Sequence, residues 1–61
     1  MPETVKWFAW SKDERSGRWM VVNEGLKNDM RRYVTQMEQA AIKHDMKATF
    51  AALPEGTEPG A

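Results

Sequence analysis

Hydrophobic and polar residues alternate differently in the two halves of the chain. Residues 4–10 (TVKWFAW) and 18–22 (RWMVV) are rich in aromatic and β-branched side chains, which favour β-strands. The polar run SKDERSG at residues 11–17 separates them and contains turn-forming residues. This pattern predicts an N-terminal β-hairpin with a fairly long loop.

From Leu26 onward the apolar residues recur with a period near 3.6 instead of two, which indicates a helix. Residues 26–53 contain neither proline nor glycine, so the pattern predicts one long helix that ends before Pro54. At about 100° per residue, one broad apolar stripe is suited to cover a face of the hairpin. Its members are Leu26, Met30, Tyr33, Val34, Met37, Ala40, Ala41, His44, Ala48 and Ala52.

A second apolar stripe lies nearly opposite the first and consists of Ile42, Met46, Phe50 and Leu53. One explanation is a break near residues 43–45, with Asp45 capping a short second helix that folds back. The other is a continuous or bent helix whose far side contacts another chain. Because the break would lack the glycine or proline usual at such corners, the sequence favours the second explanation.

The predicted fold class is therefore α+β. We expect residues 1–53 to form a single ββα domain. Residues 54–61 (PEGTEPGA) offer no large apolar side chain and are expected to form a flexible, disordered tail. A domain of this size buries only about 60% of the surface that its unfolded chain exposes. With no cysteine for a disulfide, additional stability has to come from dense packing or from association.

The first predicted strand is apolar on both of its faces, since Trp7, Phe8, Ala9 and Trp10 occupy both phases of the alternation. A hairpin alone is marginally stable and has two open edges. A homodimer, with hairpins joined into a four-stranded sheet or helices packed by the second stripe, would cover these surfaces, as would another stable partner. The predicted interface residues are Phe8 and Trp10 (or Trp7 in the opposite phase), Trp19, Ile42, Met46, Phe50 and Leu53.

The charge of the chain is balanced, with nine Lys and Arg against nine Asp and Glu, so it lacks the basic excess that gives general affinity for nucleic acids. An alternative is still open, because aromatic and basic side chains are interleaved along the hairpin and could stack bases and hold a single strand. A paired ribbon from a dimer could instead enter a major groove. The candidate contacts for this alternative are Lys6, Trp7, Lys12, Arg15, Arg18, Arg31 and Arg32.

Catalytic patterns are weak in this sequence. His44 and Asp45 are adjacent and would point about 100° apart on a helix, so they do not form a base and its orienting acid. Ser11 and Ser16 lie in a polar turn without a glycine-flanked elbow, and there is no glycine-rich phosphate loop. We therefore expect no enzymatic activity, no cofactor, no metal and no small-molecule substrate.

No apolar run approaches the roughly 20 residues needed to span a bilayer, and the N-terminus lacks the features of a signal peptide. The expectation is a cytoplasmic protein with no membrane contact. Aromatic residues, arginine and methionine are enriched at protein interfaces. The favoured function is a homodimeric, non-enzymatic protein-binding module, an inhibitor or accessory regulator of the kind that phages and other mobile elements encode.

Overall fold

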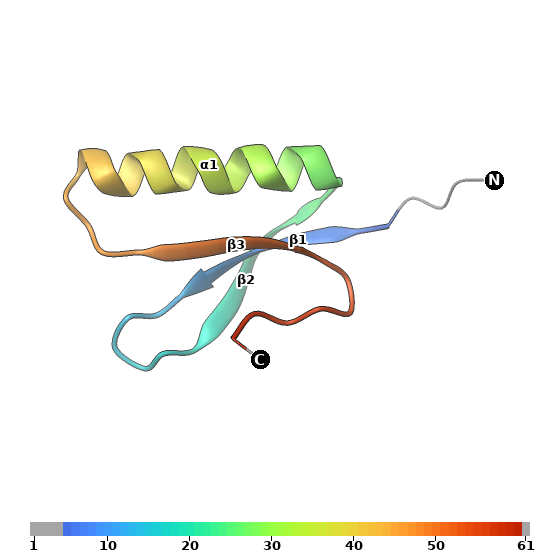
Figure 1. Ribbon diagram of the computed structural model, residues 1–61, viewed down its shortest axis with the longest axis horizontal. Coiled ribbons are helices and arrows are strands. Elements are labelled where there is room, and N and C mark those ends of the chain that lie inside the picture. The colour runs from blue at the N-terminus through green and yellow to red at the C-terminus, as the bar shows by residue number, and fades with distance from the viewer. Residues whose placement is uncertain (1–4, 61) are drawn as a thin grey trace.

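The computed structural model describes residues 5–60 and shows a three-stranded antiparallel sheet with one helix along one face (Figure 1). The elements are β1 (Trp7–Lys12), β2 (Trp19–Gly25), α1 (Lys27–Lys43) and β3 (Thr49–Pro54), and the strand order is β2-β1-β3. The α+β class and the order of hairpin and then helix are confirmed. Residues 1–4 and 61, which include the expected start of the first strand and the last residue of the tail, lie outside the described residues.

Asp13 organises the loop of the β1–β2 hairpin. Its carboxylate accepts hydrogen bonds from the backbone N–H of Arg15 at 2.9 Å and from the hydroxyl of Ser16 at 3.1 Å. The backbone N–H of Gly17 donates to the carbonyl of Asp13 at 2.7 Å, and Gly17 has a φ of 73°, which favours glycine. Hydrogen bonds among its own residues therefore stabilise the polar run that was predicted to be a loop.

The pairing of β1 with β2 contains one irregularity. Ala9 pairs with Asn23 and Trp10 with Val21, which leaves Val22 as an extra residue on β2. Such a β-bulge bends its strand and shifts the alternation of the side chains. As a result, the alternation of side chains between the two faces of the sheet shifts by one residue at Val22.

The helix is shorter than predicted. It spans 17 residues and ends at Lys43, so the expected continuous or bent helix to Leu53 is wrong. Asp45 has a φ of 53°, its N–H donates to the carbonyl of Ile42, and the N–H of Met46 donates to the carbonyl of Ala41. These bonds form a Schellman motif, the usual way to end a helix, with aspartate in the left-handed position that glycine normally takes. The break lies where the less favoured explanation placed it.

The chain beyond the break forms a strand and not the short second helix of that explanation. β3 pairs with β1 on the side opposite to β2, with Ala9 facing Ala52 and Ser11 facing Phe50. It fills one of the two edges that a hairpin alone would leave open, which turns the expected ββα arrangement into ββαβ. Pro54 stands at the end of β3, where a residue without an N–H is tolerated.

The small core lies between α1 and the two strands β1 and β3. Ala9 is completely buried, and Met30 and Val34 of α1 are almost completely buried around it. Trp7, Tyr33, Phe50 and Ala52 pack against these three residues. The first half of the predicted helical stripe therefore covers the sheet as expected, but β2 contributes no residue to this cluster.

The C-terminal segment turns back across the face of the sheet opposite the helix. The N–H of Glu55 donates to the carbonyl of Lys6 at 2.8 Å, and the N–H of Thr57 donates to the carbonyl of Pro54 at 3.1 Å. Figure 1 shows this segment curving from the end of β3 back toward β2. Its expected flexibility stays a prediction.

Candidate protein-binding surfaces

The sheet has a helix-covered face and a face that we call the outer face. Because paired residues of an antiparallel sheet lie on the same side, the registers assign each side chain to one of the two faces. Trp7 and Ala9 lie under the helix. The registers assign Phe8, Trp10, Lys12, Trp19, Val21, Glu24, Thr49, Ala51 and Leu53 to the outer face, and Lys6 lies beside Glu24 on the same side. Of the two phases open from sequence, the structure has Phe8 and Trp10 pointing away from the helix.

A groove of about 440 Å³ runs along the outer face. Phe8, Trp10 and Val21 line one side, and residues 56–58 of the C-terminal segment line the other. The indole N–H of Trp10 is buried and has no hydrogen-bond acceptor within residues 5–60. The groove therefore has aromatic and aliphatic walls, and one of its lining residues, Trp10, carries a buried donor without a partner among the described residues.

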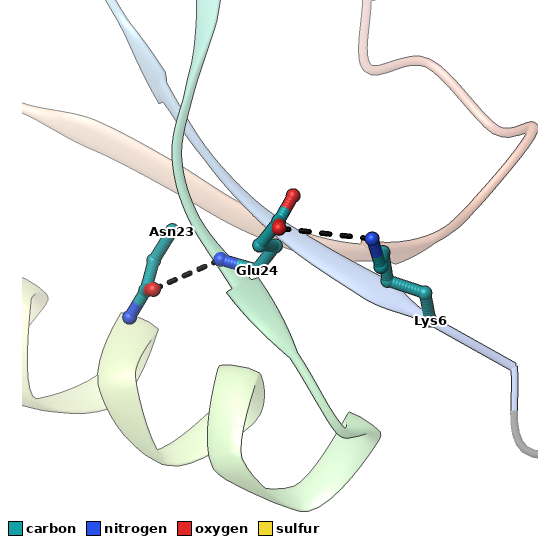
Figure 2. Close-up of polar contacts among 3 residues, drawn as sticks. All are labelled: Lys6, Asn23 and Glu24. Atoms are coloured by element: carbon teal, nitrogen blue, oxygen red, sulfur yellow. Dashed lines mark hydrogen bonds and ion pairs between the residues drawn. The ribbon is translucent and has the colours of Figure 1, made fainter.

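Lys6 and Glu24 form an ion pair at one end of the outer face, with Lys6 Nζ 3.6 Å from Glu24 Oε1 (Figure 2). Lys6 Nζ also lies 6.0 Å from the centre of the Phe8 ring, and the side chain of Asn23 accepts a hydrogen bond from the backbone N–H of Glu24. Both charged side chains are about half exposed, so this pair contributes little to stability. It places one positive and one negative charge at this end of the outer face.

Strand β2 carries exposed apolar residues along the edge of the sheet, which we call the β2 strip. It consists of three consecutive residues, Met20, Val21 and Val22, whose exposed fractions are 57%, 46% and 41%. Met20 pairs with Ser11 on the helix side and Val21 pairs with Trp10 on the outer face, so the strip includes both sides of this edge. β2 is an edge strand, and its outward backbone groups have no partner strand in the part of the chain that the structure describes. Exposed aliphatic residues on an open edge are the signature of a strand that pairs with another chain.

The second helical stripe of the sequence analysis does not exist. Ile42 is 79% exposed on the helix and Met46 lies in the motif that ends it, whereas Phe50 and Leu53 belong to β3. Phe50 packs into the core under the helix, and Leu53 pairs with Phe8 on the outer face. These four residues share no surface, because the period of 3.6 that joined them was applied across the end of the helix.

The candidate nucleic-acid contacts are divided between separate regions. Trp7, Arg31 and Arg32 lie beside the first half of α1, Lys6 and Lys12 lie on the outer face, and Arg15 and Arg18 lie at the hairpin loop. The sequence analysis missed Lys27, whose Nζ lies 5.4 Å from the centre of the Trp7 ring. Its spacing of four residues before Arg31 on a helix could have indicated it.

Few features of the structure bear on catalysis. Hydrogen bonds from the backbone of Arg15 and then from the Ser16 hydroxyl lower the pKa of Asp13 below its ordinary value. His44 is exposed at the end of the helix. Between residues 5 and 60, no group of three His, Cys, Asp or Glu residues is arranged to hold a metal ion.

Comparison of the chain with protein-family models, with curated proteins and with solved structures finds no match. No helix in the described part of the chain is long and apolar enough to cross a membrane.

Proposed function

We propose that this chain is a small, non-enzymatic protein-binding module that forms a homodimer through β2 and acts as an inhibitor or accessory regulator of another protein. The observation that carries the proposal is the β2 strip. Pairing β2 with a second copy gives its outward backbone groups partners and partly covers the aliphatic side chains on both sides of the edge. A cytoplasmic location is part of the same proposal, since the chain contains no cysteine and depends on no disulfide.

The composition of β2 favours pairing with an identical strand. Natural edge strands are usually protected by proline, by lysine or by a covering element. β2 (WMVVNEG) has no proline and one charged residue, Glu24, whereas β3, the other edge strand, ends in Pro54. Val22 is the midpoint of β2, so antiparallel pairing about a two-fold axis brings the valines of two copies together. The joined sheet would have the order β3-β1-β2-β2-β1-β3.

Dimerisation through β2 would not itself cover the outer face, which the C-terminal segment covers in part. Phe8, Trp10 and Trp19 are large, half-buried aromatic residues of the type that dominates binding energy at interfaces. Polar and charged side chains surround them, including the ion pair of Lys6 and Glu24. This arrangement, anchors within a polar rim, supports the binding of a protein more than the conversion of a substrate.

Light scattering coupled to size-exclusion chromatography tests the dimer. We expect the wild type to be a dimer at micromolar concentration and Val22→Lys to be a monomer with unchanged circular dichroism, because lysine protects an edge strand. Ile42→Lys is the matched control, since it removes an even more exposed aliphatic residue from outside β2. A wild type that stays monomeric throughout, or an Ile42→Lys variant that dissociates as Val22→Lys does, would contradict the proposal.

A second candidate function is nucleic-acid binding beside α1. It is favoured by one observation, the clustering of Trp7 with Lys27, Arg31 and Arg32 around two hollows. Fluorescence anisotropy with short single-stranded and duplex DNA, repeated over a salt series, tests it. Tight binding that weakens steeply with salt and is lost in Arg31→Glu would support this function over protein binding.

A further inference from the structure

The C-terminal segment reaches the outer face through a specific turn. The hydrogen bond from Glu55 to Lys6 extends the ladder between β1 and β3 by one step beyond Pro54. The bond from Thr57 to Pro54 then closes a turn in which Gly56, the third residue, has a φ of 91°. A turn with this positive φ is of type II and requires glycine there. The sequence PEGT thus directs the last residues across the sheet.

Beyond the turn, the segment has small side chains, and its backbone lies against aromatic rings. A Cβ atom placed on Gly60 would lie 2.8 Å from Nε1 of Trp19, closer than atoms can approach. Only glycine therefore lets the backbone lie this close to the indole. Pro59, next to it, is half-buried. Proline and glycine backbone laid on tryptophan is the chemistry by which aromatic-lined grooves bind extended peptides.

Charge complements this contact. Residues 54–61 contain Glu55 and Glu58 and no basic residue. On the sheet, Lys12 pairs directly with Trp19, and Arg18 precedes that tryptophan. Positive charge therefore lies beside the ring that Gly60 contacts, and Asp13 and Glu14 of the hairpin loop follow Lys12 in the sequence.

The segment is anchored only at its base. Among the described residues, its backbone hydrogen bonds are those of Glu55 and Thr57, and Glu58 makes no ion pair. The indole N–H of Trp10 stays without an acceptor although the segment lines the same groove. A segment held by so few polar contacts opens at low free energy. A ligand that displaces the segment and offers a carbonyl to Trp10 would satisfy this donor.

We infer that the aromatic outer face beside the groove is a docking site for an extended, acidic peptide segment containing proline and glycine. Residues 55–60, which form one wall of the groove, cover part of this site as a displaceable stand-in. The inference rests on the proposed protein-binding function and names the chemistry of its partner. It does not depend on dimerisation through β2. Because the segment covers part of the site, the apparent affinity for the partner equals the intrinsic affinity multiplied by the fraction of molecules in which the segment is released.

The test uses the full chain and the synthetic peptide PEGTEPGA as the probe. Gly60→Val places a side chain against Trp19 at a φ of 78°, so it should release the segment. Gly17→Val is the matched control, because Gly17 has a similar φ of 73° but open space around it. Gly60→Ala is a milder variant of the same kind, and circular dichroism verifies that each variant is folded.

Binding is measured from the NMR shifts of the indole N–H groups of Trp10 and Trp19 during titration with the peptide. We expect Gly60→Val to bind about tenfold more tightly than the wild type or Gly17→Val, because more of its grooves are open. The peptide PKGTKPGA, with both charges reversed, should bind more weakly. Equal binding by all variants, or no binding by folded Gly60 variants whose Trp19 signal shows release, would overturn the inference.

Repeating the titration with Gly60→Val combined with Val22→Lys separates this inference from the proposed dimer. Peptide binding by the monomeric double variant supports the docking site independently of association. Loss of peptide binding in that folded double variant would contradict a site contained within one chain. Light scattering on the same samples reports the dimer by itself.

Discussion

Replacing Asp45 by glycine should change the free energy of unfolding, and the sign of that change distinguishes the observed end of the helix from the continuous helix that the sequence favours. In the structure Asp45 has a φ of 53°, a conformation that disfavours a residue with a Cβ by about 1–2 kcal/mol. Glycine removes this strain but loses about 0.5–1 kcal/mol of backbone entropy on folding. The net expectation is a gain of about 0.5–1 kcal/mol in the free energy of unfolding. If the helix continued through residue 45, glycine would instead destabilise it by about 1 kcal/mol.

Thermal unfolding followed by circular dichroism and tryptophan fluorescence measures this change. For a domain of this size, 1 kcal/mol shifts the Tm by about 4–8 °C, so the sign is readily resolved. His44→Gly is the matched control, because His44 has a φ of −98° and glycine there should only destabilise. All proteins are compared at one concentration, since the proposed dimerisation would make the Tm depend on concentration. A lower Tm for Asp45→Gly would refute the assigned helix end.

Two further predictions concern the core and the hairpin loop. Phe50→Asp should unfold the chain, not merely split an assembly, because Phe50 packs under the helix; urea titration with light scattering separates these results. Asp13 contributes stability that is present above the ordinary pKa of aspartate and is lost as the pH falls through its lowered pKa in the folded state. An NMR titration should find that lowered pKa. Between neutral and acidic pH, the free energy of unfolding should fall less in Asp13→Ala than in the wild type.

The sequence predicts those parts of the fold that local pattern determines. The hairpin follows from two aromatic, β-branched segments around a polar loop, and the first half of α1 follows from Met30, Tyr33 and Val34 at helical spacing. The break at residues 43–45 was visible only as an alternative. The helix ends at an aspartate in a left-handed conformation. Because aspartate adopts this conformation less readily than glycine does, sequence rules seldom predict a helix end there.

β3 could not be predicted from its own residues. The segment TFAALP contains three good helix formers, and its strand conformation depends on the open edge of β1, a contact far along the chain. Extending the helix through these residues also produced the predicted second stripe. In the structure the members of that stripe lie in three places, namely the core, the outer face and the end of the helix. The position of the C-terminal segment was missed for a related reason, because its small residues are informative only when Trp19 and the groove are known.

The two proposed contacts involve one common residue, since Val21 belongs to the β2 strip and also lines the groove of the outer face. A two-fold axis perpendicular to the joined sheet would keep both outer faces on the same side. The grooves of two copies would then flank the shared edge, and a partner carrying two acidic, proline-containing segments could occupy both. The second segment would bind at a high effective concentration, so the dimer would bind such a partner far more tightly than the Val22→Lys monomer does. A single segment would bind both forms alike, because each groove is complete within one chain.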